Sequence, residues 1–333
     1  MAYYDIPTHQ WVYSRHSDAA VAGVIRLKND LESVLTQRGY GSLYPAKRCI
    51  VTESNISRMS FNEQMGSALG QLNFAMKAII AAHRYDIDQF HFFLLADKKT
   101  TTQATNPWDL MGMYYAINTV QPYQQGIVPA GIACKTTMDM LKGYRYDAAH
   151  TTLLQLPDAV QGAAFADSTG AHIYALWAKT STDQSEAAAY TYAFPPEMDL
   201  SVLEMREWDY SSTDAAELVN ASKISLNSTP VFLIPSSVTD VTTMAIPPFQ
   251  VHFFPNPYLG GDGKLIVKTT QTVSLHIVLL DAQGRKVATL ASGSSLAAGN
   301  HEFDISRLSL ASGIYHCQLS SGDFSVSQRI ICL

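Results

Sequence analysis

Apolar residues in the first 148 positions alternate between short continuous runs and longer segments with helical spacing. Three runs have the length of strands and lie at residues 3–8, 48–52 and 90–96. Four segments carry apolar residues near helical spacing and lie at residues 18–38, 61–85, 109–120 and 130–142. The run at 90–96 is apolar almost throughout, which is typical of a strand buried on both faces. This alternation predicts parallel strands joined by crossover helices.

Near His150 the pattern changes, and strand-like segments follow one another without helices between them. These strands are expected at residues 159–165, 173–178, 188–193, 202–208, 223–226 and 231–234. They predict an antiparallel β-sandwich or an added sheet. Residues 236–248 are rich in Ser, Thr and Pro, which is typical of a linker. Six further strands are expected beyond it, at residues 265–268, 275–280, 286–290, 301–304, 313–319 and 324–331.

The pattern therefore predicts an α/β plus all-β chain of three domains. Residues 1–148 form an α/β domain, residues 149–236 a β-sandwich, and residues 249–333 a small Ig-like β-sandwich. In the second domain, Trp177 and Trp208 are expected in the core, and Glu186 is expected to pair with a nearby cation.

Composition narrows the function classes. The net charge of −6 comes without a basic block, which argues against nucleic acid as a partner because phosphate binding needs clustered Lys and Arg. No apolar run reaches the roughly 18 residues of a membrane helix, so no membrane span is expected. The ten His form no HExxH motif or close pair, and no Gly-rich loop opens a helix, so neither a metal nor another cofactor is expected. The 17 Tyr and 13 Phe fit β-rich cores and also sugar stacking.

The four cysteines form no CxxC pair and give no zinc signal. Cys49 lies in an apolar run and is expected to be a buried thiol. Cys317 and Cys332 fall on the last two expected strands, where the sequence leaves open whether they form a disulfide. The N-terminal residues have neither the basic nor the apolar region of a signal peptide.

The terminal module carries an ordered set of turn motifs, in which Gly284 is expected to supply a positive φ. They are Phe254-Pro255-Asn256-Pro257-Tyr258, Leu280-Asp281-Ala282-Gln283-Gly284-Arg285-Lys286-Val287, Ala298-Gly299-Asn300-His301 and Leu310-Ala311-Ser312-Gly313-Ile314-Tyr315. In order and spacing these motifs resemble the C-terminal sorting domain of the type 9 secretion system. The alternative is an ordinary fibronectin-like accessory sandwich. The resemblance implies a secreted or cell-surface protein with the type 9 secretion machinery as a partner.

One carboxylate of the α/β domain stands at a position suited to catalysis. Glu53 directly follows the strand-like run at 48–52. In (β/α) barrels the catalytic groups lie at the carboxyl ends of strands, and a carboxylate there can attack an anomeric carbon. A helix cap or a salt bridge is the alternative role for Glu53.

Four segments of the first two domains carry a second resemblance. They are Tyr4-Asp5-Ile6-Pro7-Thr8-His9, the run at 88–97, the strand at 160–165 and the strand at 173–180. Together they resemble the last three β/α units of a retaining (β/α)8-barrel glycoside hydrolase of the xylosidase, iduronidase or agarase kind, followed by its β-sandwich. The resemblance implies a carbohydrate substrate, with Glu53 as the nucleophile and His9 at the sugar.

Three further residues are weaker candidates for the same pocket. Asn55 would lie beside Glu53, Asp97 would lie at the rim, and Trp108 would be a stacking platform. For Asp97 a turn or capping role is equally open, and for Trp108 a core or lid-packing role.

The chain departs from the glycosidase pattern in one respect. Retaining hydrolysis needs two carboxylates, and the family supplies its acid/base from an Asn-Glu pair after the fourth strand. The one such pair here, Asn62-Glu63, lies downstream of Glu53 and so in the wrong place. We therefore expect an N-terminally incomplete hydrolase that is inactive by itself, and this would also explain the absent signal peptide. The alternatives are a non-catalytic glycan-binding surface protein and a split enzyme completed by another chain.

Overall fold

The computed structural model describes most of the chain as two compact units, Met1–Val241 and Thr242–Leu333. The described residues are 2–5, 9–13, 15–62, 64–117, 126–236, 249–254, 258, 263–281, 284–306, 308, 310–311, 313–322 and 324–332. The predicted linker at 236–248 lies outside them apart from Ser236, as do Glu63 and Pro255–Pro257 of the motifs above. No described helix is both long and apolar enough to span a membrane.

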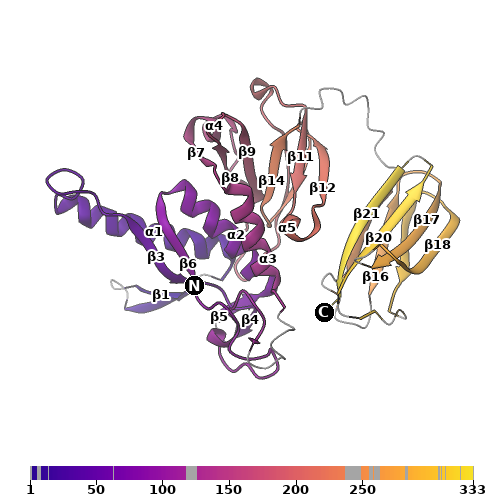
Figure 1. The fold of residues 1–333 in the computed structure, drawn as a ribbon, viewed down its shortest axis with the longest axis horizontal. Helices are drawn as coiled ribbons and strands as arrows, with labels where there is room; N and C mark the ends of the chain where they lie inside the picture. Colours follow the sequence, from indigo (N-terminus) through magenta and orange to yellow (C-terminus); the bar gives the residue numbers. More distant parts are fainter. Residues whose placement is uncertain are drawn as a thin grey trace. The chain divides into compact units, whose positions relative to one another are not determined.

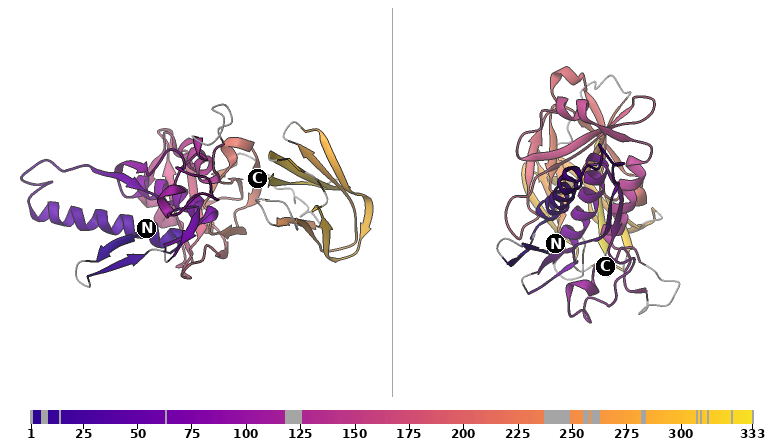
Figure 2. Two further views of the ribbon diagram at one scale, coloured as in Figure 1. Left: turned by 90° about the horizontal axis from the view of Figure 1, so that it is seen from below. Right: turned by 90° about the vertical axis from the view of Figure 1, so that its left-hand side faces the viewer.

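The first unit contains the predicted parallel pair with a crossover helix (Figure 1). Strand β3 (Cys49–Ser54) pairs in parallel with β6 (Ile87–Phe92), and α2 (Ala68–Arg84) connects them. Helix α1 (Ser17–Gln37) packs on α2 through contacts such as Ala20 against Phe74. The second half of α1 extends away from the rest of the unit (Figure 2).

The expected first parallel strand is wrong. β1 (Ala2–Asp5) pairs antiparallel with β2 (Gln10–Tyr13), so it belongs to a separate hairpin. The expected strand at 90–96 also ends early, at Phe92, and its side chains alternate in exposure, so β6 is not buried on both faces. Cys49 on β3 is likewise half-buried, not buried.

Two expected helices differ from the structure. The segment at 61–67 belongs to a hairpin of β4 (Met59–Phe61) and β5 (Gln64–Ser67), because Ser67 caps α2 by accepting a hydrogen bond from the Gly70 amide at 2.9 Å. Of the helix expected at 109–120, residue 109 ends the short 3-10 turn η1 (Pro107–Asp109), residues 110–116 are not helical, and residues 118–120 lie outside the described part of the chain. The backbone of this segment runs alongside residues 95–97, where the Asp97 amide donates to the Tyr114 carbonyl.

A six-stranded antiparallel sheet forms the centre of the first unit, in the order β12-β11-β14-β9-β8-β7. Its strands are β7 (Arg145–Asp147), β8 (Val160–Ala166), β9 (His172–Ala178), β11 (Val202–Arg206), β12 (Ala216–Asn220) and β14 (Val231–Pro235). The pattern predicted all of these except β7 and β12. The short helices α4 (Ala148–Leu153) and α5 (Tyr210–Thr213), with the 3-10 turn η3 (Pro196–Met198), connect them.

The sheet has a hydrophobic core on each face. On one face Phe165, Trp177 and Phe232 pack against α2 and α3 (Pro129–Leu141). On the other face Leu176 and Leu203 pack against the pair of β10 (Ala189–Tyr192) and β13 (Ile224–Asn227). The α/β segment and the second run of strands therefore share one core. Trp177 lies in it as expected, and Trp208 packs at its edge, partly buried.

The second unit is a sandwich of two antiparallel sheets. One sheet has the order β15-β16-β19 and the other β18-β17-β20-β21. Their strands are β15 (Phe249–Phe254), β16 (Lys264–Thr269), β17 (Val273–Asp281), β18 (Lys286–Leu296), β19 (Gly299–Asp304), β20 (Gly313–Ser321) and β21 (Phe324–Cys332). Gly284, with φ 76°, confirms the expected turn between β17 and β18.

The two cysteines of the sandwich lie on neighbouring strands but not opposite each other. Cys317 pairs with Gln328, and Cys332 with Gly313, so the register separates the two thiols. Both are free and buried, and burial raises the pKa of Cys317 to about 12. The structure therefore has no disulfide between them.

A buried ion pair connects α1, α2 and the six-stranded sheet. The fully buried Lys77 ammonium on α2 lies 2.8 Å from the Asp18 carboxylate on α1. Asp18 also accepts hydrogen bonds from the Trp177 indole at 2.9 Å and from the amide and hydroxyl of Thr180. Burial alone would raise the pKa of Asp18, but Lys77 and these donors outweigh it and lower the pKa below its usual value.

Glu186 extends this buried network, although it forms no direct ion pair with Lys77. Its carboxylate accepts hydrogen bonds from the amide and hydroxyl of Ser17 at 2.6 and 2.7 Å and from the Asn73 amide group at 2.8 Å. The Ser17 hydroxyl in turn accepts from the Lys77 ammonium at 2.9 Å. Glu186 therefore does not pair directly with a cation as expected, and its link to Lys77 runs through the Ser17 hydroxyl.

Lys77→Met removes the ammonium and leaves Asp18 buried without its counter-ion, so the first unit should lose about 3–5 kcal/mol of unfolding free energy. Urea unfolding followed by circular dichroism measures this loss. The matched control is Lys135→Met, because Lys135 forms an exposed pair with Asp139 and should change stability by less than about 1 kcal/mol. Adding Asp18→Asn to Lys77→Met should recover part of the loss, and equal stability of Lys77→Met and the wild type would contradict the role assigned to the pair.

Candidate functional site

Glu53 lies at an irregular position near the carboxyl end of the parallel pair. Val51 pairs with Phe90 and Ser54 with Phe92, so β3 holds one more residue than β6 over this stretch. This is a β-bulge, a feature that re-aims side chains and is frequent beside active sites. Both Thr52 and Glu53 are exposed there. The Glu53 carboxylate forms no hydrogen bond or ion pair with the described residues, so it is open to a ligand.

Asn55 is a buried residue that directly follows β3 and hydrogen-bonds to neighbouring segments. Its side chain is 7% exposed and donates to the carbonyl oxygens of Phe93 and Met111, at 3.3 and 2.6 Å. Its own side-chain oxygen accepts from the Ile56 amide at 2.8 Å. All these contacts are internal, so Asn55 positions the chain around Glu53.

Asp97 fixes the same region from the other side. It is 3% exposed, forms an ion pair with Arg58, and accepts from the Gly112 amide at 2.8 Å. Burial raises the pKa of Asp97, against the opposing effects of Arg58 and the Gly112 amide. A side chain on Gly112 would come within 2.1 Å of the Asp97 amide nitrogen, so the close approach of the two segments requires glycine.

Trp108 is the exposed aromatic group at this end of the strands. It lies on η1, is 53% exposed, and contacts Phe93 edge to face with ring centroids 5.8 Å apart. A shallow pocket of about 450 Å³ lies beside it. The pocket is lined by Phe61, Asn62, Gln64, Thr105, Asn106, Pro107 and Trp108.

Glu53 lies on β3 itself, and Asn55, Asp97 and Trp108 lie on the segments that follow β3 and β6. Asn55 and Trp108 both contact Phe93, and Asp97 contacts Gly112, next to the Met111 carbonyl that Asn55 binds. His9 is different, because it is exposed in the turn of the separate β1–β2 hairpin, with φ 54°.

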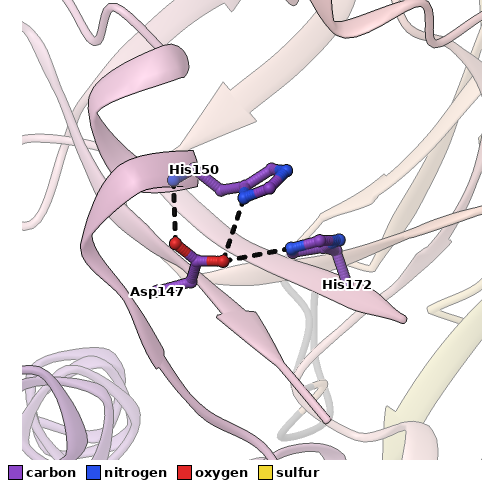
Figure 3. A group of neighbouring side chains, drawn as sticks. All are labelled: Asp147, His150 and His172. Atoms are coloured by element: carbon purple, nitrogen blue, oxygen red, sulfur yellow. Dashed lines mark hydrogen bonds and ion pairs between the residues drawn. The ribbon is translucent and has the colours of Figure 1, made fainter. Parts of the chain in front are cut away.

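A second polar cluster, not expected from the sequence, joins β7, α4 and β9 (Figure 3). The Asp147 Oδ2 atom lies 2.9 Å from His150 Nδ1 and 3.2 Å from His172 Nε2. The Asp147 Oδ1 atom accepts from the His150 amide at 2.9 Å, which caps α4. The two imidazole rings are in contact and tilted, with centroids 3.7 Å apart and planes inclined by 32°.

The register of the antiparallel strands brings these three residues together, and their spacing along the sequence does not reveal that they are close. Asp147 pairs with Ala164 on β8, and Ala164 pairs with Tyr174 on β9, two residues after His172 and on the same face of the strand. Burial would raise the pKa of Asp147, but hydrogen bonds from His150 and His172 outweigh it and lower the pKa. One group of possible metal ligands is found among the described residues, namely Asp147, His150 and His172. One donor atom of each lies within 4.8 Å of the others, so the three side chains could hold a metal ion.

Comparison with known proteins assigns the second unit. Residues 252–333 match the family model of the secretion system C-terminal sorting domain. The terminal module is therefore a type 9 sorting domain that interacts with the type 9 secretion machinery. The protein is accordingly secreted or held at the cell surface through type 9 secretion.

One solved structure is weakly similar to the chain. A bacterial orthologue of human α-L-iduronidase is similar at 9% identity and a TM-score of 0.28, over 82% of this chain and 55% of that chain. The chain thus spans about half the length of that structure. No curated protein matches the chain.

Asn55→Ala should destabilise the first unit by about 1–3 kcal/mol, because the buried Met111 carbonyl loses its donor. Thermal and urea unfolding measure the change. Glu53→Gln is the matched control, since an exposed side chain without internal contacts should change stability by no more than about 0.5 kcal/mol. Wild-type stability for Asn55→Ala would show that the side chain is free for another role.

Proposed function

We propose that the first unit is part of a secreted retaining glycoside hydrolase in which Glu53 is the nucleophile. The observation that carries the proposal is the exposed Glu53 carboxylate on a bulge at the carboxyl end of the parallel β3–α2–β6 unit. Ligands bind at this end of parallel strands, and bulges there aim side chains. The motif resemblance of the same strands to retaining glycosidases supports the sugar as the substrate class.

The surrounding residues take different parts in this proposal. Asn55 and Asp97 are positioning residues, because their polar atoms already bind the chain around them. Trp108 presents an exposed ring beside a pocket, which suits stacking on a sugar face. His9 remains the proposed sugar-binding histidine of the β1–β2 turn.

The acid/base is the missing partner of Glu53. Retaining chemistry needs a second carboxyl group about 5–5.5 Å from the nucleophile. Asp97 does not qualify, because Arg58 and the Gly112 amide already bind it. We therefore assign the acid/base to strands that the described residues do not supply.

The surface of the first unit supports such a complement. In the part of the chain that the structure describes, β3 and β6 pair only with each other, so both outer edges of the pair are unpaired. Leu27, Leu31 and Val34 form an exposed apolar stripe along α1, and Ile50 of β3 is 47% exposed. Unpaired edges and apolar stripes are features that further β/α units of a barrel would cover.

Glu53→Gln in the native protein from its source cells should lower hydrolysis of aryl glycosides by several orders of magnitude, because the glycosyl-enzyme cannot form. A 2-deoxy-2-fluoro glycoside should label the wild type at Glu53, as read by peptide mass spectrometry. Glu207→Gln, at another exposed carboxylate, is the control and should keep full turnover. Near-normal turnover of Glu53→Gln, or a label on another residue, would exclude Glu53 as the nucleophile.

The size of the native protein separates this proposal from its rivals. An antibody against residues 249–333 that detects a species far larger than 36.5 kDa would support a longer hydrolase. A species of 36.5 kDa or less would favour a non-catalytic glycan-binding protein, or a split enzyme if a half-barrel chain co-purifies.

Removal of residues 249–333 should hold the protein in the periplasm, since the truncated chain lacks the part that the secretion machinery engages. Immunoblots of periplasm, cell surface and medium, with an epitope tag in the first unit, measure the distribution. Because residues 242–333 form a separate compact unit, the first unit should remain folded after the deletion. Undiminished secretion of the truncated chain would show that the sorting signal lies elsewhere.

A further inference from the structure

We propose that Asp147, His150 and His172 form a binding site for a divalent transition metal of the Zn²⁺ type. The proposal is independent of the glycosidase assignment, because these residues lie on β7, α4 and β9 and not at the Glu53 end of the β3–β6 pair.

The distances between the donor atoms fit a tetrahedral ion. With metal–ligand bonds of about 2.0–2.2 Å, neighbouring donor atoms of a tetrahedral site lie roughly 3.3 Å apart. Asp147 Oδ2 lies 2.9 Å from His150 Nδ1 and 3.2 Å from His172 Nε2, and the three donors lie within 4.8 Å of one another. Small side-chain shifts would therefore place all three around one ion.

The donor set selects the class of metal. Two imidazoles and one carboxylate suit Zn²⁺ and its transition-metal neighbours, whereas Ca²⁺ and Mg²⁺ prefer all-oxygen sites. The exposed fraction of the side chain is 36% for His150, 19% for His172 and 22% for Asp147. A metal can thus enter from solvent, and water would complete its coordination.

Contacts behind the donors hold them in place. Asp147 Oδ1 is bound to the His150 amide, which turns Oδ2 toward the two rings. The Thr151 hydroxyl donates to the Asp147 carbonyl at 2.7 Å and accepts from the Ala164 amide at 2.9 Å, so α4 is tied to β8. The His172 ring stacks on Tyr174, with planes inclined by 10°. Supporting contacts of this kind raise metal affinity by fixing the ligands before the ion arrives.

The competing explanation is a hydrogen-bonded cluster that needs no ion. Both imidazoles can donate an N–H to Asp147 Oδ2 if each adopts the appropriate tautomer. In that case Asp147 would serve only as the cap of α4. Asp147→Asn separates the two explanations, because Asn caps helices as well as Asp but lacks the charged ligand oxygen.

The test uses the whole 333-residue chain, stripped of metal, with ZnCl₂ in calorimetry and CoCl₂ in absorption spectroscopy. We expect one Zn²⁺ per chain, a visible Co²⁺ spectrum of four-coordinate intensity without thiolate charge-transfer bands, and a higher melting temperature of the first unit with Zn²⁺. His150→Ala, His172→Ala and Asp147→Asn should each weaken Zn²⁺ binding by more than about 100-fold, since even supporting residues contribute 10–100-fold. His91→Ala, at an exposed histidine on β6, is the matched control and should bind like the wild type.

Three results would overturn the proposal. They are no Zn²⁺ binding by a folded wild-type chain, unchanged binding in the three ligand variants, and a Co²⁺ spectrum dominated by thiolate bands, which would place the ion on cysteines. Circular dichroism of each variant checks folding, and Asp147→Asn keeps the test valid if a histidine variant fails to fold.

Discussion

The buried pair of Lys77 and Asp18 is the interaction on which the first unit depends. Burial by itself lowers the pKa of Lys77, so the ammonium is retained there through Asp18 and the Ser17 hydroxyl. Asp18 in turn binds Trp177 and Thr180 at the end of β9. One charge pair therefore fixes the position of α2 against both α1 and the six-stranded sheet. Because α2 connects β3 to β6, the same pair sets where the strand carrying Glu53 lies.

Around Glu53, buried polar groups that bind the backbone lie behind a carboxylate that is exposed and unbound. Behind it, Asn55 and the Asp97–Arg58 pair bind backbone atoms of the segments at 93 and 111–112. These hydrogen bonds stabilise the segments behind Glu53, although Arg58 Nε is buried without a partner among the described residues. The Glu53 carboxylate stands apart from these bonds, on a bulge, which is the arrangement expected of a group that meets a ligand. Rigid support and a free reactive group are complementary requirements of a catalytic site.

The sequence predicted those parts of the fold that depend on local pattern. The strands β8 and β9 and the turn at Gly284 are confirmed, because neighbouring residues specify them. The start of α2 was wrong, because helical spacing continues through a hairpin that the Ser67 cap terminates. The Asp18–Lys77 pair joins residues 59 positions apart, and the Asp147–His172 contact joins residues 25 apart. Such contacts depend on packing and strand register, which spacing along one sequence does not reveal.

Asp147 of the cluster lies where the two sequence patterns of the first unit meet along the chain, on the edge strand β7 of the antiparallel sheet. A metal there would bind β7, α4 and β9 together only in the folded state, because the three donors are scattered in an unfolded chain. Such an ion stabilises by RT ln(1 + [L]/Kd), so a free concentration 100 times Kd contributes about 2.7 kcal/mol. The type 9 sorting domain sends this chain outside the cell, where the medium sets the metal concentration. Stability of the edge strand β7 would then vary with the surroundings, while the Lys77–Asp18 pair stabilises the rest of the unit without any ligand.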